Sequence, residues 1–561
     1  MTVVDQRFAA SSCQVLNTQR RADTGDENAM THETSAFARE ATGLVRSISV
    51  PTMFMYQVSG LVPCFMLIWA YTDIGYFYPG ANMMLASIIV AVLTVPTIGI
   101  TETLMTIAYP RSGGEYIWIS RVFHPGLGFA AGVQYLMAQP STVGMFSATL
   151  SSFVLATVFS TIGLVTNNPG LMAVSATLGT PNMIFILGAT ITIIATLVMI
   201  APLKVFSIYQ TIGFIASIIG IAILFYLLGA NTTGSFAAGF NRYSSVPFDQ
   251  LTATASQKGA TVPTGFDMGA TLLALPYLIW WATTYWNIYP AGEAKSPAKS
   301  MVVAGLGGMV LFWVIMIVGG VLYYNVIPYQ SAYSMTFLYY NGAAPLPAGM
   351  YPSPQLLAVF LTSNVWLVSI LVIMFFLGFV YVWPGWWMVF SRAIFAYSFD
   401  RVIPTKLSDV NERTHTPIWA ILLCTVFSFV FIFWCAYGPY FWAVTHFTLW
   451  ACSTGFIPAM LAGAVFPYRK RDWFQASPKI VQTKILGIPL LTISGLLGAA
   501  VLIFQVAQTF IVDWALPEGR FGVGLEIGVW IAAFIIYYAS KYYHLSKGID
   551  ITKAFKEIPP E

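Results

Sequence analysis

The sequence predicts an all-α integral membrane protein with about twelve transmembrane helices. Hydrophobic residues make up 57% of its 561 residues, charged residues only 9%, and the mean hydropathy is +0.72. A soluble domain carries roughly 25% charged residues. A helix that crosses a bilayer needs about 20 mostly apolar residues. Runs that approach or exceed this length occupy residues 50–71, 82–108, 126–160, 183–201, 203–229, 268–291, 301–324, 360–398, 417–437, 440–466, 485–511 and 521–543.

The distribution of Lys and Arg predicts the orientation of these spans. Residues 1–45 are polar, carry both signs of charge and resemble neither a signal peptide nor a span, so we expect a largely disordered cytoplasmic tail. With this tail inside, 23 of the 26 Lys and Arg residues fall on the cytoplasmic side, and only Arg242, Lys258 and Arg520 fall outside. Basic residues mark the cytoplasmic face. We therefore expect a multi-pass protein of the plasma membrane with both termini in the cytoplasm.

Composition and cysteine spacing limit the kinds of ligand and partner that we expect for this protein. The five cysteines show no CxxC pair or Cys/His ligand spacing, so neither a disulfide framework nor a metal site is expected, and no cofactor is implied. The net charge of +4 is small and the basic residues are scattered, which gives no reason to expect a nucleic-acid partner. The expected partners are the lipid bilayer and a small molecule; the oligomeric state is left open.

Two spans are interrupted in the middle. In the sixth, Pro276 is followed by the run 280–284 (WWATT), and a helix is expected to kink or open just ahead of the proline. In the first, small residues and Pro63 occur within 57–63 (QVSGLVP). Within a bilayer, backbone without helical hydrogen bonds is tolerated only where it is buried in protein or lines a polar cavity.

Interrupted helices at positions one and six are typical of transporters built from inverted repeats, with a binding site at the midplane. We therefore expect a first repeat over 46–229, an outer loop over 230–267 and a second repeat over 268–471. Residues 472–561 supply two further spans and a cytoplasmic C-terminal tail. A half-helix N-terminus favours a carboxylate, whereas freed carbonyls accept from an ammonium group. The two demands together fit an amino acid.

Three ordered motifs give a family resemblance. Residues 109–116 (YPRSGGEY), continued by 120–129, resemble the loop after the second helix in the amino acid/polyamine/organocation (APC) superfamily. Residues 292–297 (GEAKSP) are similar to its segment after the sixth helix, and 391–404 with Thr416 and Pro417 to its signature after the eighth. The resemblance implies a leucine-transporter-like fold of 5+5 helices that transports amino acids or related amines by alternating access.

The same resemblance implies a substrate site. Ser59 and Gly60 match the last two places of the family's glycine-serine-glycine element, with Val58 in place of the first glycine. The amides from Ser59 to Leu61 would hold a carboxylate. In the sixth helix Trp281 matches the aromatic lid. The remaining implied contacts are the carbonyls of Ile279 and Ala282, Thr283 where the family has glycine, and Tyr285 where it has glutamate.

Embedded ionisable groups are functional candidates by default. Glu102 in the second span and His446 in the tenth are the candidates for a proton relay, and a structural role for each is an alternative. The middle of the eighth span, 373–382 (IMFFLGFVYV), offers only Tyr381 as a hydroxyl ligand, which disfavours sodium. Proton coupling, exchange and facilitation remain open.

Other classes fit less well. An enzyme would need a nucleophile with its base, metal ligands or paired histidines, and a single deep histidine does not supply them. A channel would need rings of charges or filter carbonyls. A sensor or a subunit of a membrane complex that retained the fold without transport is the remaining alternative.

Overall fold

A computed structural model describes residues 44–347, 350–513 and 516–557. Its architecture is helical, as the sequence predicts. The first five spans lie between Val50 and Gly229. They comprise α2 (Val50–Leu61), α3 (Pro63–Trp69), η1 (Ala70–Ile74) and α4 (Gly75–Phe77); α5 (Met83–Thr94), η2 (Val95–Gly99) and α6 (Ile100–Ala108); α8 (Pro125–Thr149), η3 (Leu150–Leu155) and α9 (Ala156–Val165); α11 (Pro181–Ile200); and α12 (Leu203–Gly229).

The remaining spans follow in chain order. They comprise α15 (Met268–Ala282), η5 (Trp286–Ile288) and η6 (Ala291–Glu293); α16 (Pro297–Lys299), η7 (Ser300–Leu306) and α17 (Gly307–Val326); α20 (Val365–Val380) and α21 (Trp383–Phe399); α22 (Ile418–Tyr437); α23 (Phe441–Arg469); α25 (Leu490–Asp513); and α26 (Pro517–Ser546).

Eleven of the twelve expected spans are covered by helical stretches of at least 20 residues, long and apolar enough to cross a membrane; in the first, only Val62 interrupts the stretch. The expected span that does not reach this length is the sixth, which is interrupted. There α15 ends after 15 residues and is continued by short 3-10 turns, so no single helix reaches the length of a bilayer. The shortfall results from the interruption itself.

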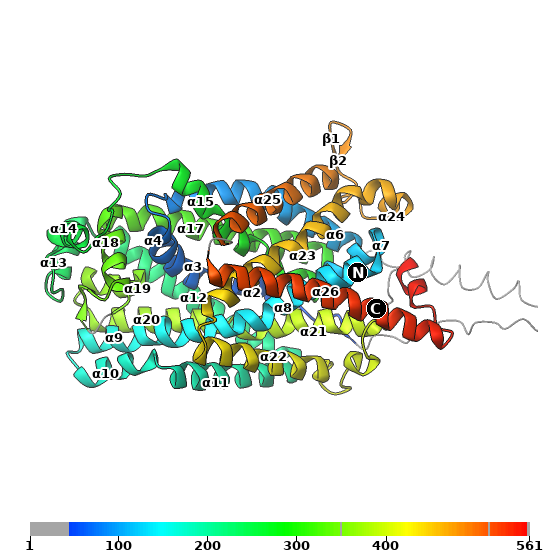
Figure 1. Cartoon of the computed structure of the whole chain (residues 1–561), viewed down its shortest axis with the longest axis horizontal. Helices are drawn as coiled ribbons and strands as arrows, with labels where there is room; N and C mark the ends of the chain where they lie inside the picture. The colour runs from blue at the N-terminus through cyan, green and yellow to red at the C-terminus, as the bar shows by residue number, and fades with distance from the viewer. Residues whose placement is uncertain (1–43, 348–349, 514–515, 558–561) are drawn as a thin grey trace, which may run out of the picture. The chain divides into compact units, whose positions relative to one another are not determined.

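Short elements gather at the two ends of the helical core (Figure 1). α7 (Tyr116–Val122) and α24 (Arg471–Ala476) lie at one end, and α13 (Thr233–Phe240), α14 (Leu251–Gln257) and α18 (Tyr329–Tyr340) lie at the other. The outer loop expected over 230–267 therefore contains two helices, α13 and α14. A capping box explains the start of α13, because the Thr232 and Ser235 side chains each accept from the other's backbone N–H.

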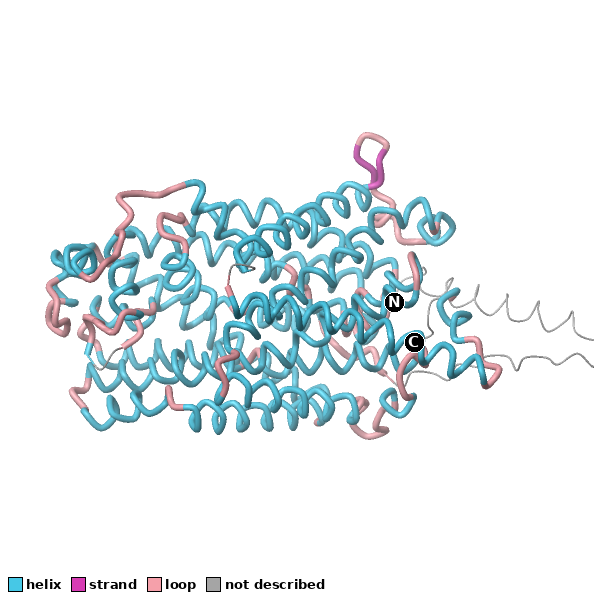
Figure 2. The backbone as a smooth tube through the Cα atoms, viewed as in Figure 1, coloured by secondary structure: helices cyan, strands magenta, loops and turns pink. Residues whose placement is uncertain are grey.

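The remaining short elements lie between these helices, apart from η11, which follows the last one. They are α10 (Pro169–Leu178), η4 (Phe248–Gln250), α19 (Pro354–Leu357), η9 (Ala358–Leu361), η10 (Thr405–Ser408) and η11 (Ile551–Lys556). In the described residues the only sheet is a hairpin of β1 (Lys484–Ile485) and β2 (Ile488–Pro489), which projects beyond the helices in Figure 2.

The helix α8 lies at the centre of the packing and contacts α21, α22, α23 and α26. Small residues permit this close approach. A Cβ atom at Gly144 would lie 2.7 Å from the backbone of Phe431 on α22, and one at Gly455 on α23 would lie 2.8 Å from the Ala131 carbonyl oxygen. The third span is thereby packed directly against spans eight, nine, ten and twelve of the second half of the chain.

Candidate functional site

The first span breaks at Val62. This residue adopts a left-handed conformation, with φ 42° and ψ 60°, between the end of α2 and the start of α3. Pro63 disfavours the helical conformation in the residue before it and has no N–H of its own. A β-branched residue in this region of φ is strained, so surrounding packing must hold it there. The expected interruption of the first span is confirmed.

The sixth span breaks later than its proline. α15 continues through Pro276 and ends at Ala282, and Thr283 to Tyr285 connect it to η5. The helix does not open just ahead of Pro276, and the break lies after Ala282 instead. A proline leaves the carbonyl one turn earlier without its helical donor, and the Gln508 side chain of α25 donates to that oxygen, on Leu272, at 3.1 Å. Gln505 likewise donates to the Pro276 carbonyl at 3.0 Å.

The two breaks lie against each other. The Gln57 side-chain amide donates to the Thr284 carbonyl at 2.7 Å. A Cβ atom at Gly60 would lie 2.7 Å from Cδ2 of Trp286 and 3.0 Å from Cγ2 of Thr284. Only glycine therefore fits at position 60 while Trp286 keeps its place. The irregular backbone of both helices is thus gathered in one buried region.

Aromatic rings surround this region. Trp281 makes ring contacts with Phe65 (centroids 5.8 Å apart), Phe146 (5.9 Å) and Trp280 (5.2 Å), and only 4% of its surface is exposed. We call the set formed by Phe65, Trp69, Phe146, Trp280, Trp281 and Phe379 the aromatic cluster; its rings come from α3, α8, α15 and α20.

The other expected substrate contacts are buried around the breaks. Ser59 Oγ donates to the Tyr56 carbonyl (2.7 Å) and Thr283 Oγ1 to the Trp280 carbonyl (2.6 Å). The Tyr285 hydroxyl is engaged with α6 and η7: it lies 2.6 Å from Thr103 Oγ1 and donates to the Met301 carbonyl at 3.0 Å. The remaining expected contacts, Leu61, Ile279 and Ala282, are buried side chains at the two breaks.

The two candidate relay residues occupy different surroundings. Glu102 is fully buried on α6, and neither carboxyl oxygen has a hydrogen-bond partner among the described residues. Such a group is costly to bury. His446 on α23 lines a cavity of about 400 Å³ together with Trp69, Tyr277 and Glu518. We call it the His446 cavity.

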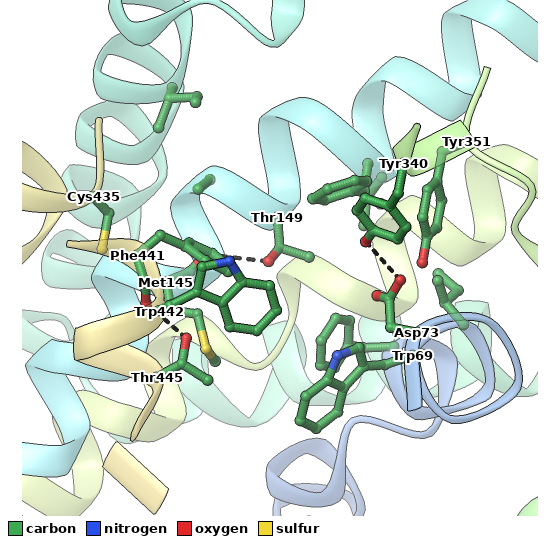
Figure 3. Close-up of a pocket in the computed structure, with 16 residues that line it drawn as sticks. Trp69, Asp73, Met145, Thr149, Tyr340, Tyr351, Cys435, Phe441, Trp442 and Thr445 are labelled. Atoms are coloured by element: carbon green, nitrogen blue, oxygen red, sulfur yellow. Dashed lines mark hydrogen bonds between the residues drawn. The ribbon is translucent and has the colours of Figure 1, made fainter. Parts of the chain in front are cut away.

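A second cavity of about 300 Å³ lies beside the aromatic cluster and is shown in Figure 3. Phe65 and Trp69 line it, together with Asp73 and residues of α8, α18, α22 and α23. We call it the Asp73 cavity. Trp69 and Trp442 line both cavities, so the two adjoin.

Three of the sequence motifs come together at the end of the core that carries α7. Arg392 and Glu293 form a salt bridge at 2.8 Å, and Arg121 and Asp400 form another at 2.9 Å, with all four side chains buried. Tyr116 also donates to Asp400 (2.9 Å). These pairs tie the loop after the second span and the end of the sixth span to the eighth. The motifs marked these segments, but the pairing of their charges was not predicted.

Glu115 of the first motif accepts a hydrogen bond from the Tyr289 hydroxyl at 2.6 Å. Burial raises the pKa of this carboxyl group to about 7, and the hydrogen bond from Tyr289 offsets part of that effect. The backbone is tied here too, because Gly113 N–H donates to the Tyr289 carbonyl (3.1 Å). The loop after the second span therefore holds the last turns of the sixth.

A polytopic helical protein whose two interrupted helices meet beside buried aromatic residues belongs to the class of membrane transporters. A family model described as amino acid permease matches residues 49–538. The chain therefore belongs to the amino acid permeases of the APC superfamily, and the resemblance seen in its motifs is confirmed. Amino acids in general are the cargo of this family, which points to a transporter rather than an enzyme. No curated protein matches the chain.

Proposed function

We propose that this permease is a secondary active transporter that carries an amino acid or a related amine across the plasma membrane by alternating access. The observation that carries the proposal is the meeting of the two helix breaks at the Gln57–Thr284 hydrogen bond. Backbone groups released at such breaks offer N–H donors to a carboxylate and carbonyls to an ammonium group. Ser59, Gly60 and Leu61 lie on one side, and Ile279, Ala282 and Thr283 on the other.

Alternating access requires the site to open to each side in turn. The salt bridges Arg392–Glu293 and Arg121–Asp400 and the Glu115–Tyr289 hydrogen bond close the end that carries α7. Most basic residues fall at this end in the expected topology, so we propose that it faces the cytoplasm. The repeats proposed for 46–229 and 268–471 would then move relative to each other when these contacts separate.

Proton coupling or exchange fits better than sodium coupling. The eighth span breaks between α20 and α21 at Tyr381 and Val382, and its middle carries no serine or threonine that could serve as a sodium ligand. Glu102 and His446 are the proposed proton sites. A non-transporting sensor is favoured by one observation: Tyr285, which replaces the family's acid, is engaged with Thr103 and Met301.

The test is uptake into proteoliposomes. A pool of labelled amino acids and amines is offered under an inward proton gradient, under an inward sodium gradient, or with unlabelled substrate inside. We expect accumulation under the proton gradient or with internal substrate. Trp281→Leu should then lower the affinity for the substrate, whereas Trp366→Leu, at a ring that is 80% exposed, should not. No uptake by verified, folded protein in any condition would favour the sensor.

A further inference from the structure

We propose that the Asp73 cavity is a binding site for small organic cations, separate from the helix breaks. The inference goes beyond the proposed transport, because a ligand bound here need not be the molecule that is carried. It rests on the single carboxylate of the cavity, on its aromatic walls and on the absence of a neutralising charge among the described residues.

The carboxylate faces the cavity. Asp73 lies on η1, directly after α3, and its side chain is partly exposed and lines the cavity. The Tyr340 hydroxyl donates to Asp73 Oδ1 at 2.8 Å, and Figure 3 shows the Tyr340 and Tyr351 hydroxyls on the side of this carboxylate. Within the described part of the chain, the buried salt bridges join other residues and none includes Asp73. Its charge is therefore available to a ligand.

The walls are aromatic and held in place. Seven rings line the cavity: Phe65, Trp69, Phe153, Tyr340, Tyr351, Phe441 and Trp442. Two of these rings also pack against aromatic residues that do not line the cavity. Tyr340 stacks on Tyr76 with centroids 5.1 Å apart, and Trp442 meets Phe77 edge-on at 5.4 Å. Aromatic faces attract a cation through their quadrupole, and quaternary ammonium ligands are recognised in this way.

The charge balance excludes a ligand with its own carboxylate. The described residues that line the Asp73 cavity include neither Lys nor Arg, so a carboxylate there would have no cationic partner and would lie near Asp73. The adjoining His446 cavity adds a second acid, Glu518. The volume of about 300 Å³ lies at the small end of ligand pockets. The ligand class is thus an amine or quaternary ammonium ion with a single ring or a short apolar chain.

The experiment uses the full chain in nanodiscs of phosphatidylcholine and measures binding by calorimetry. The probes are phenethylammonium, benzyltrimethylammonium and 3-phenylpropionate, which keeps the ring but reverses the charge. We expect both cations to bind and the anion not to bind. Asp73→Asn should weaken cation binding by about tenfold or more. The matched control, Asp249→Asn, removes an exposed carboxylate in η4 and should leave binding unchanged.

A second variant tests the walls. Trp442→Leu should weaken the binding of benzyltrimethylammonium. This ion cannot donate a hydrogen bond, so its binding depends on contact with the aromatic rings. Equal binding of cation and anion by the wild-type protein would overturn the inference, even if the Asp73 variant failed to fold, and so would full affinity in a folded Asp73→Asn protein. Cation binding without any uptake would refute the proposed transport alone. Amino acid uptake without cation binding would refute the Asp73 site alone.

Discussion

Arg392 donates two parallel hydrogen bonds to Glu293, from Nε to Oε1 and from Nη2 to Oε2, each 2.8 Å long. The two residues are 99 positions apart and join α21 to the end of the sixth span. The backbone before the first span reaches the same place, since Ile48 N–H donates to the Glu293 carbonyl (3.0 Å). A bidentate pair of this kind fixes orientation as well as distance, so spans one, six and eight share one anchor.

Removal of one partner should be much more harmful than removal of both. Arg392→Met leaves the Glu293 carboxylate buried and uncompensated, which costs about 3–5 kcal/mol in comparable cases. We expect a clearly lowered Tm in detergent, and a partial recovery in the double variant Arg392→Met with Glu293→Leu. Arg413→Met, at an exposed arginine, is the control. A single variant as stable as the wild-type protein would show that the pair is not an anchor.

Glu115 should make the stability of the protein depend on pH. Its pKa is raised from the ordinary value of 4.5 to about 7, chiefly by burial. Between these two values the folded state binds more protons than the unfolded state, so stability falls as the pH rises through this range. Glu115→Gln should remove that part of the fall in Tm between pH 5 and pH 8. Glu412→Gln, at an exposed acid, should leave the profile unchanged, and identical profiles for all three proteins would contradict the assignment.

Glu102 is the better supported of the two candidate proton sites, because both of its carboxyl oxygens are buried and have no hydrogen-bond partner among the described residues. Glutamine preserves its shape but cannot carry a proton. We expect Glu102→Gln to lower proton-driven uptake by about 100-fold or more, the lower end of a general acid–base contribution, and to retain exchange with internal substrate. The control Glu412→Gln changes an exposed acid that lines neither cavity. Undiminished accumulation in Glu102→Gln would leave His446 as the site to test.

The sequence predicts the spans well because apolar length is a local property. The interruption of the sixth span was predicted, but its position was not. Pro276 breaks the hydrogen-bonding pattern only if nothing replaces the lost donor, and Gln508, more than 230 residues away, donates to the carbonyl concerned. Local sequence cannot contain that information. The first break falls at Val62, directly before Pro63, where the proline and the residue before it determine the conformation.

The directions of the side chains at the candidate site could not be predicted for the same reason. The residues implied by the family motifs do lie at the two breaks, but Tyr285 turns toward Thr103, and its direction depends on how α6 packs. Asp73 lies two residues beyond the expected first span, 50–71, and no local pattern marks it as part of a site. Its importance arises from Tyr340, 267 positions later, which the packing of α18 places beside it.

Gly60 offers the most direct test of the meeting of the two breaks. A Cβ atom there would lie 2.7 Å from Cδ2 and 2.8 Å from Cε3 of Trp286, which itself packs against Gly385. The indole therefore has no room to yield, and even Gly60→Ala should separate α2 from the sixth span. We expect substrate uptake to fall by about tenfold or more, because misplacement of a positioned site by about 1 Å has effects of 100-fold.

The matched control for this variant is Gly528→Ala. It makes the same change within a helix at a position where a Cβ atom meets nothing within 4 Å. Alanine is favoured over glycine in a helix by about 1 kcal/mol, so this variant should be at least as stable as the wild-type protein and should transport normally. If Gly60→Ala and Gly528→Ala take up substrate equally well, the contact between Gly60 and Trp286 does not position the site, and the proposed carboxylate contact at Ser59 to Leu61 fails with it.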